Sequence, residues 1–73
     1  MEVIDLRHEI CPINLVKFKY HFYRLQNLHN FEKSSFLIKN GEPLNGVIRF
    51  LEYKKVTFNL QDKDDFVVLN IKN

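Results

Sequence analysis

The stretch DLRHEICPIN, residues 5–14, joins two kinds of sequence pattern. Residues 3–6 are mostly β-branched or apolar, which is typical of a short strand. After the stretch, apolar side chains recur at spacings of three and four, which is typical of a helix. Pro12 fits the first helical turn, because its missing N–H would have no intrahelical partner there. The stretch therefore predicts a strand-to-helix junction, with Cys11 at or beside the N-terminal cap and the free N–H groups of the first turn nearby.

The pattern after this junction predicts a first helix over residues 12–28. One face of this helix is apolar, and it consists of Leu15, Phe18, Phe22 and Leu25, with Val16 and Tyr23 widening it. The opposite face is basic, and it consists of Lys17, His21 and Arg24. The asparagines within residues 27–30 suit the left-handed conformation that ends many helices.

The same two periodicities predict the remaining elements. They are a strand over residues 34–39, a helix from Pro43 to near Tyr53, and strands over residues 56–60 and 66–71. The second helix would bury Leu44, Val47, Ile48 and Leu51. Asn40-Gly41 is a turn signal, and the polar residues 61–65 make a turn that pairs the last two strands as a hairpin. Gly46 lies inside the second helix, where glycine costs roughly 1 kcal/mol relative to alanine, so we expect a close packing contact there.

The predicted order is strand, helix, strand, helix, strand, strand. Four strands and two amphipathic helices fit an α+β two-layer sandwich, with a four-stranded mixed sheet in one layer and both helices in the other. The 73 residues make one domain over residues 1–73. Because a chain this short buries only about 60% of the surface that its unfolded form exposes, its margin of stability is small. The polar residues Lys39, Asn59 and Asn70 suit a sheet face that is open to water.

The composition argues against several classes of protein. One cysteine allows no internal disulfide, and three histidines in different segments have no metal-ligand spacing, so we expect no metal and no cofactor. A free thiol and the absence of a recognisable secretory leader favour the cytoplasm. No apolar run approaches the roughly 18 residues of a membrane span. A net charge of +2 is too small to indicate direct binding of nucleic acid.

Cys11 is the candidate reactive residue. The start of a helix favours negative charge by about 0.3–1 kcal/mol, and Arg7 and His8 are close enough in sequence to add to this effect. Lowering a thiol pKa by two units requires about 2.7 kcal/mol, so we expect only partial activation. With no second cysteine for a redox pair, the carrying of a group is favoured over multi-step catalysis. Cys11 also fits a small buried hydrophobic side chain, which is the commoner role of a free cysteine.

Three short motifs follow one another along the chain. They are Asp5-Leu6-Arg7 followed after three residues by Cys11-Pro12, then Val16-Lys17, and then Gly41-Glu42-Pro43. Together with the chain length and the order of elements, they resemble the TusA/SirA-like (YedF-like) sulfur-carrier family over essentially the whole chain. The resemblance implies a β-α-β-α-β-β two-layer sandwich. It also implies that Cys11 receives sulfur as a persulfide from a cysteine desulfurase-like donor and passes it to an acceptor protein. The motif residues that it places around this cysteine are Asp5, Arg7 and Pro12, and His8 lies beside them in the sequence as a further supporting residue.

The chain departs from the family pattern at two positions. Asn14 stands where the family has a second proline, and His8 stands where a glycine is common. If the resemblance holds, the basic face of Lys17, His21 and Arg24 would dock an acidic partner. Two other functions stay open. One is a regulatory protein-interaction module with a structural Cys11, and the other is a small RNA-binding module that uses the basic helix.

Overall fold

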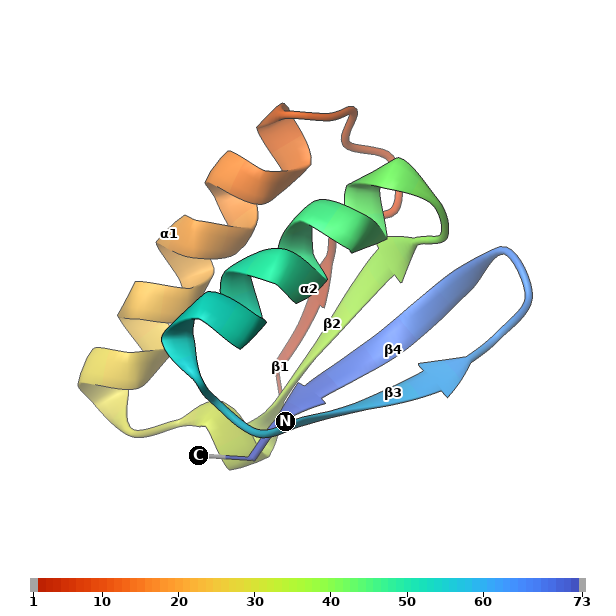
Figure 1. The fold of residues 1–73 in the computed structure, drawn as a ribbon. Helices are drawn as coiled ribbons and strands as arrows, with labels where there is room; N and C mark the ends of the chain where they lie inside the picture. The colour runs from red at the N-terminus through yellow and green to blue at the C-terminus, as the bar shows by residue number, and fades with distance from the viewer. Residues whose placement is uncertain (1, 73) are drawn as a thin grey trace.

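Four strands form one mixed sheet, and two helices cover one of its faces (Figure 1). The computed structural model describes residues 2–72. In chain order the elements are β1 (Glu2–Asp5), α1 (Ile13–Leu28), the short 3-10 helix η1 (Phe31–Lys33), β2 (Ser34–Lys39), α2 (Glu42–Lys54), β3 (Phe58–Asp62) and β4 (Phe66–Ile71). This architecture confirms the predicted α+β two-layer sandwich.

The strands lie in the order β1-β2-β4-β3. The crossover through α1 returns the chain parallel to its first strand, so β1 and β2 pair in parallel, with Ile4 opposite Phe36. β4 runs antiparallel to both of its neighbours, β2 and β3. Its central position explains why its side chains alternate between buried and half-buried, with Val67, Leu69 and Ile71 turned toward the helices.

The core lies between the sheet and the two helices and is rich in phenylalanine. The ring centroids of Phe18 and Phe36 are 4.7 Å apart, which brings α1 against β2. The ring of Phe22 packs at a tilt against Phe31 of η1, with centroids 5.2 Å apart, and meets Phe50 of α2 edge-on at 5.2 Å. Burying an aromatic ring in such contacts removes a large apolar area from water. The fully buried hydrophobic residues of the two helices are Phe18, Phe22, Leu25, Val47 and Leu51, all of which were predicted from periodicity.

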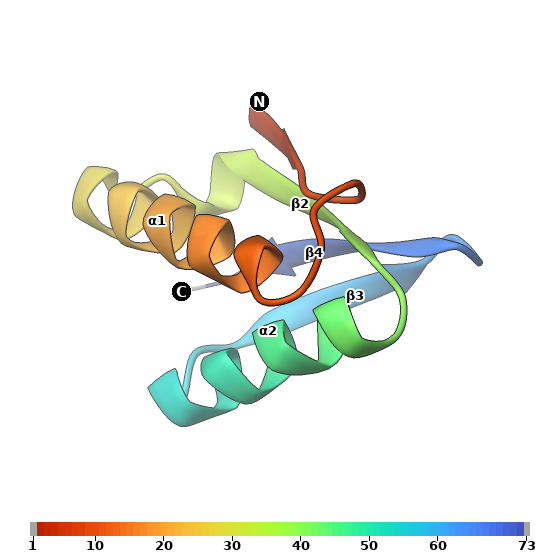
Figure 2. The ribbon, with the colours of Figure 1, turned by 90° about the horizontal axis from the view of Figure 1, so that it is seen from above.

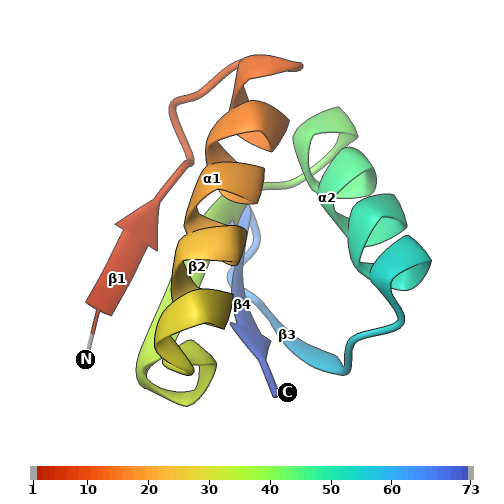
Figure 3. The same cartoon turned by 90° about the vertical axis from the view of Figure 1, so that its left-hand side faces the viewer.

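The buried face of α1 is narrower than the sequence pattern predicts. Val16 and Tyr23 were expected to widen it, and both are exposed. Val16 lies two residues before Phe18 and therefore about 200° around the helix from it. The sheet and α2 cover only the side of α1 that carries Phe18 and Phe22 (Figure 3). The prediction that Val16 and Tyr23 widen the buried face was wrong. An apolar side chain is buried only where another element packs against its side of the helix.

The ends of several elements also differ from their predictions. α1 begins at Ile13 with Pro12 as its N-cap, and the left-handed residue that ends it is His29 (φ 53°), not an asparagine. α2 begins at Glu42, one residue before the predicted start. β3 is shifted by two residues, because its ladder with β4 continues to the pair Asp62–Val67. The polar turn is accordingly shorter than predicted, and β3 is an edge strand whose polar residues face water.

Gly46 lies where α2 passes α1. A Cβ built on Gly46 would lie 3.8 Å from Cδ2 of Leu15, which is an ordinary van der Waals contact. The expected helix–helix contact is therefore present, but it leaves room for a methyl group. Gly41 is different, since its φ of +99° lies in the region that favours glycine.

Candidate functional site

Cys11 lies in the loop that connects β1 to α1, at the end of the molecule where α2 also begins (Figure 1 and Figure 2). Its thiol is free and exposed to solvent. It immediately precedes Pro12, the N-cap of α1, to which it is joined by a cis peptide bond. The exposure contradicts the interpretation of Cys11 as a buried hydrophobic side chain, and it makes the sulfur accessible to another protein.

Backbone hydrogen bonds at the start of α1 hold the chain around Cys11. The N–H of Asn14 donates to the carbonyl of Ile10 at 2.9 Å, and the N–H of Leu15 donates to the carbonyl of Pro12 at 3.1 Å. These two donors of the first turn are therefore occupied within the loop, contrary to the expectation that they are free. Cys11 lies inside the turn that the first of these bonds closes, so its position follows that of the helix start.

Asn14 connects this helix start to the other helix. Its side chain is almost fully buried (1% exposed), and its Nδ2 donates to the carbonyl of Pro43, in the first turn of α2, at 2.9 Å. Within residues 2–72 its Oδ1 is buried with no hydrogen-bond partner. Sequence reasoning noted Asn14 only as a departure from a family pattern. Its place four residues before Phe18, on the buried face of α1, was the available signal, because a buried amide requires a partner.

Arg7 and Asp5 form an ion pair on the sheet side of the loop. The side chain of Arg7 donates to both carboxylate oxygens of Asp5, at 2.9 and 2.8 Å, and its backbone N–H donates to the same group at 3.0 Å. These hydrogen bonds lower the pKa of Asp5 from 3.8 to about 2. The guanidinium also lies 4.9 Å from the ring centroid of Phe66. Arg7 is thus directed at Asp5 and Phe66, which differs from the expectation that it acts on Cys11.

His8 is exposed and lies at the edge of a shallow hollow of about 500 Å³. The hollow is lined by Arg7, His8, Lys39, Asp65 and Phe66. These residues come from the loop and from the ends of β2 and β4, and Cys11 does not line the hollow. The structure therefore places His8 in the loop, on the wall of a hollow that Cys11 does not line.

The three residues of the predicted basic face do not form a free cationic surface. Lys17 pairs with Glu9 at 2.9 Å, and Arg24 pairs with Glu2 at 2.6 Å. Arg24 also lies 3.0 Å from Nδ1 of His21. Partial burial, together with the charge of Arg24, lowers the pKa of His21 below its usual value of 6.5. The basic face is therefore partly neutralised within the chain, because α1 packs beside β1 and the loop, which carry the two carboxylates. The docking of an acidic partner on this face stays a prediction.

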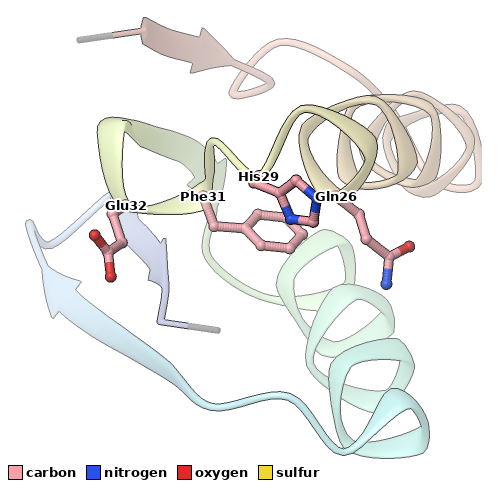
Figure 4. A pocket seen from close by; sticks show the side chains of 4 residues that line it. All are labelled: Gln26, His29, Phe31 and Glu32. Carbon is pink, nitrogen blue, oxygen red and sulfur yellow. The ribbon is translucent and has the colours of Figure 1, made fainter.

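A second hollow, of about 390 Å³, lies at the far end of α1. Figure 4 shows Gln26 and His29 from the end of α1 and Phe31 and Glu32 from η1 around it. A 16-residue helix is about 24 Å long, so this hollow is remote from Cys11. Its lining carries no thiol, and it does not belong to the candidate site.

Comparisons with protein-family models, with curated proteins and with solved structures gave no match for this chain. Within residues 2–72, no group of three or more histidine, cysteine or acidic side chains could hold a metal ion. None of the described helices is long and apolar enough to cross a membrane. The geometry of the loop around Cys11 is therefore the basis on which a function is proposed.

Proposed function

We propose that this protein is a sulfur carrier that accepts sulfane sulfur as a persulfide on Cys11 and passes it to a partner protein. The observation that carries the proposal is the exposed, unpaired thiol directly before the N-cap of α1. The β-α-β-α-β-β sandwich around it agrees with the fold that the family resemblance implies. A thiol in this position is reachable by the cysteine of a donor, which is what the transfer requires.

The proposed reaction is two successive exchanges at sulfur. In the first, the Cys11 thiolate attacks the outer sulfur of a donor persulfide, such as that of a cysteine desulfurase. A new bond forms between Sγ of Cys11 and that sulfur, the donor's sulfur–sulfur bond breaks, and the donor cysteine leaves as a thiolate. In the second, a nucleophile of the acceptor protein attacks the outer sulfur, and Cys11 leaves as a thiolate. Neither step needs an external oxidant or reductant.

The rest of the chain holds Cys11 in a fixed, exposed position, so that the donor and the acceptor can reach its sulfur. The hydrogen bond from Asn14 to Ile10 holds the turn that contains Cys11, and the Asn14 side chain holds that turn against α2. A reducing compartment such as the cytoplasm suits this chemistry, since an unpaired thiol persists there. The donor and the acceptor would meet the same exposed loop in turn.

The test is sulfur loading followed by intact-mass measurement. The protein is incubated with a cysteine desulfurase, its cofactor and cysteine, and we expect an adduct of one sulfur atom that dithiothreitol removes. Cys11→Ala should form no adduct. Cys11→Ser serves as a second control, because it keeps a polar side chain of similar size.

A negative result has a clear interpretation. Absence of an adduct with several donors, together with a thiol that resists alkylation at neutral pH, would reject the sulfur-carrier function. A regulatory protein-interaction module on the same fold would then be the better proposal. The specific observation in favour of that second function is an exposed tyrosine and lysine surface on the helical layer, described below.

A further inference from the structure

All three tyrosines of the chain are exposed, and all three lie on the helices. Tyr20 is 66% exposed, Tyr23 42% and Tyr53 80%. Val16, four residues before Tyr20 on α1, is 65% exposed. Tyr20 lies two residues after Phe18 and therefore about 200° around α1 from the buried face. The helix period therefore places Val16 and Tyr20 on the side of α1 that faces away from the sheet, and Tyr23 and Tyr53 are exposed on the same helical layer.

Two lysines lie over aromatic rings on this same surface. The Nζ of Lys54 is 5.1 Å from the ring centroid of Tyr23 and 5.9 Å from that of Phe50. The Nζ of Lys19 is 5.3 Å from the ring centroid of Phe50. These distances place both ammonium groups within reach of a cation–π interaction. Rings from α1 and α2 thus hold two positive charges between the helices.

Within residues 2–72, no carboxylate forms a salt bridge with Lys19 or Lys54. The salt bridges within this range involve Arg7, Lys17 and Arg24. The 16 residues of α1 include no aspartate or glutamate. The surface therefore combines exposed aromatic area with two cations that pair with no carboxylate of the described residues.

We propose that this surface docks an acidic protein segment that presents apolar side chains between its carboxylates. We call it the tyrosine–lysine face, and it consists of Val16, Lys19, Tyr20, Tyr23, Tyr53 and Lys54. Carboxylates of the partner pair with the two lysines, and its apolar side chains cover Val16 and the tyrosine rings. Tyrosine suits such a contact because it supplies a large apolar area at little cost in conformational entropy. The proposal goes beyond sulfur transfer, since it does not require the thiol of Cys11.

A protein segment fits this face better than a nucleic acid or a membrane. Binding to a phosphate backbone depends on many clustered cations, whereas this face has two lysines and the chain a net charge of +2. A helix that lies on a membrane carries a broad, strongly apolar face, whereas this one is largely tyrosine. Aromatic side chains with few charges are typical of the centre of a protein–protein interface.

The experiment is a titration of the ¹⁵N-labelled full chain, carrying Cys11→Ala, with synthetic peptides and nuclear magnetic resonance detection. The probe is a peptide of alternating glutamate and leucine, compared with the same peptide carrying glutamine or lysine in place of glutamate. We expect the glutamate peptide to shift the resonances of residues 16–23 and 50–54 and to bind at least tenfold more tightly than the other two. Because the thiol is absent, the result is independent of whether Cys11 carries sulfur.

A charge-reversed pair of variants sharpens the test. Lys19→Glu with Lys54→Glu should weaken binding of the glutamate peptide at least tenfold, and Tyr20→Ser should weaken it as well. The matched control is Lys33→Glu with Lys63→Glu, which makes the same change in net charge at exposed sites outside the face and should leave binding unchanged. The ¹⁵N spectra of the free variants report that each one is folded.

Several outcomes would overturn the proposal. Equal binding of the glutamine peptide would show that the lysines do not pair with the carboxylates of the glutamate peptide. Equal loss in the two charge-reversed pairs would show a response to net charge alone. Shifts at these residues with phosphatidylserine vesicles or polyuridine, but not with the glutamate peptide, would assign the face to another class of partner. Shifts that grow with protein concentration alone would assign it to a second copy of the chain.

Discussion

The side-chain amide of Asn14 donates a hydrogen bond of 2.9 Å to the carbonyl of Pro43, a residue 29 positions further along the chain. This bond joins the first turn of α1 to the first turn of α2. The backbone N–H of Asn14 meanwhile holds the turn that contains Cys11. One buried residue therefore links the candidate reactive loop to both helices. This gives the loop a fixed position relative to the rest of the fold.

We expect Asn14→Ala to lower the free energy of unfolding by about 1–3 kcal/mol, because the Pro43 carbonyl loses a donor at a buried site. Asn14→Asp should cost more, since it places an acceptor against that carbonyl and buries a charge. Urea denaturation followed by circular dichroism measures both effects. Asn59→Ala, at an exposed position on β3, is the control and should change stability by less than about 0.5 kcal/mol. Equal effects at the two asparagines would contradict a specific role for the buried bond.

The Asp5–Arg7 pair predicts a loss of stability in acid. Hydrogen bonds from Arg7 lower the pKa of Asp5 from 3.8 to about 2 in the folded chain. A depressed carboxyl pKa stabilises the folded state above the unfolded pKa, and this contribution disappears as the pH falls through the folded pKa. The difference in unfolding free energy between the natural chain and Asp5→Asn should therefore be constant above about pH 5 and shrink between about pH 4 and pH 2. Chemical denaturation across this range measures it, and a difference that does not vary with pH would contradict the assignment.

Gly46→Ala should stabilise the protein by up to about 1 kcal/mol. Alanine has the higher helix propensity, and the added Cβ would lie at an ordinary contact distance, 3.8 Å, from Leu15. Gly41→Ala should instead destabilise it, because the φ of +99° is unfavourable for a residue with a side chain. Thermal unfolding of the two variants should give shifts of opposite sign. A loss of stability in Gly46→Ala would mean that the helices cannot accept the methyl group.

Phe22 and Tyr20 lie two residues apart on α1, and replacing each by alanine should change stability by very different amounts. Phe22→Ala should cost about 3–5 kcal/mol, since the ring is fully buried against Phe31 and Phe50. That loss is comparable to the whole stability of a domain of this size. Tyr20→Ala should change stability by less than about 0.5 kcal/mol, because the ring is exposed. Denaturation midpoints test the contrast, and a large loss in Tyr20→Ala would indicate that its ring packs within the chain.

The sequence by itself was sufficient for the parts of this fold that depend on local periodicity. The strands Ser34–Lys39 and Phe66–Ile71 have the predicted bounds, and the two-layer arrangement follows from the order of elements. The position of Cys11 before the first helix was also predictable, because Pro12 marks a helix start. Spacing decides which residues share a face, so Phe18, Phe22 and Leu51 could be assigned to the core without coordinates.

Only the tertiary structure decided how the surfaces of these elements are used. Lys17 and Arg24 share a face of α1, but their carboxylate partners belong to β1 and the loop that follows it. The sequence pattern therefore predicted the basic face but not its ion pairs. In the sequence, Asn14 was only a departure from a family motif. The structure shows that its side chain donates a hydrogen bond to the carbonyl of Pro43. The tyrosine–lysine face combines residues of both helices, which only packing brings together. Periodicity determines which way a side chain points from its own element, whereas its partner depends on which distant segment folds against it.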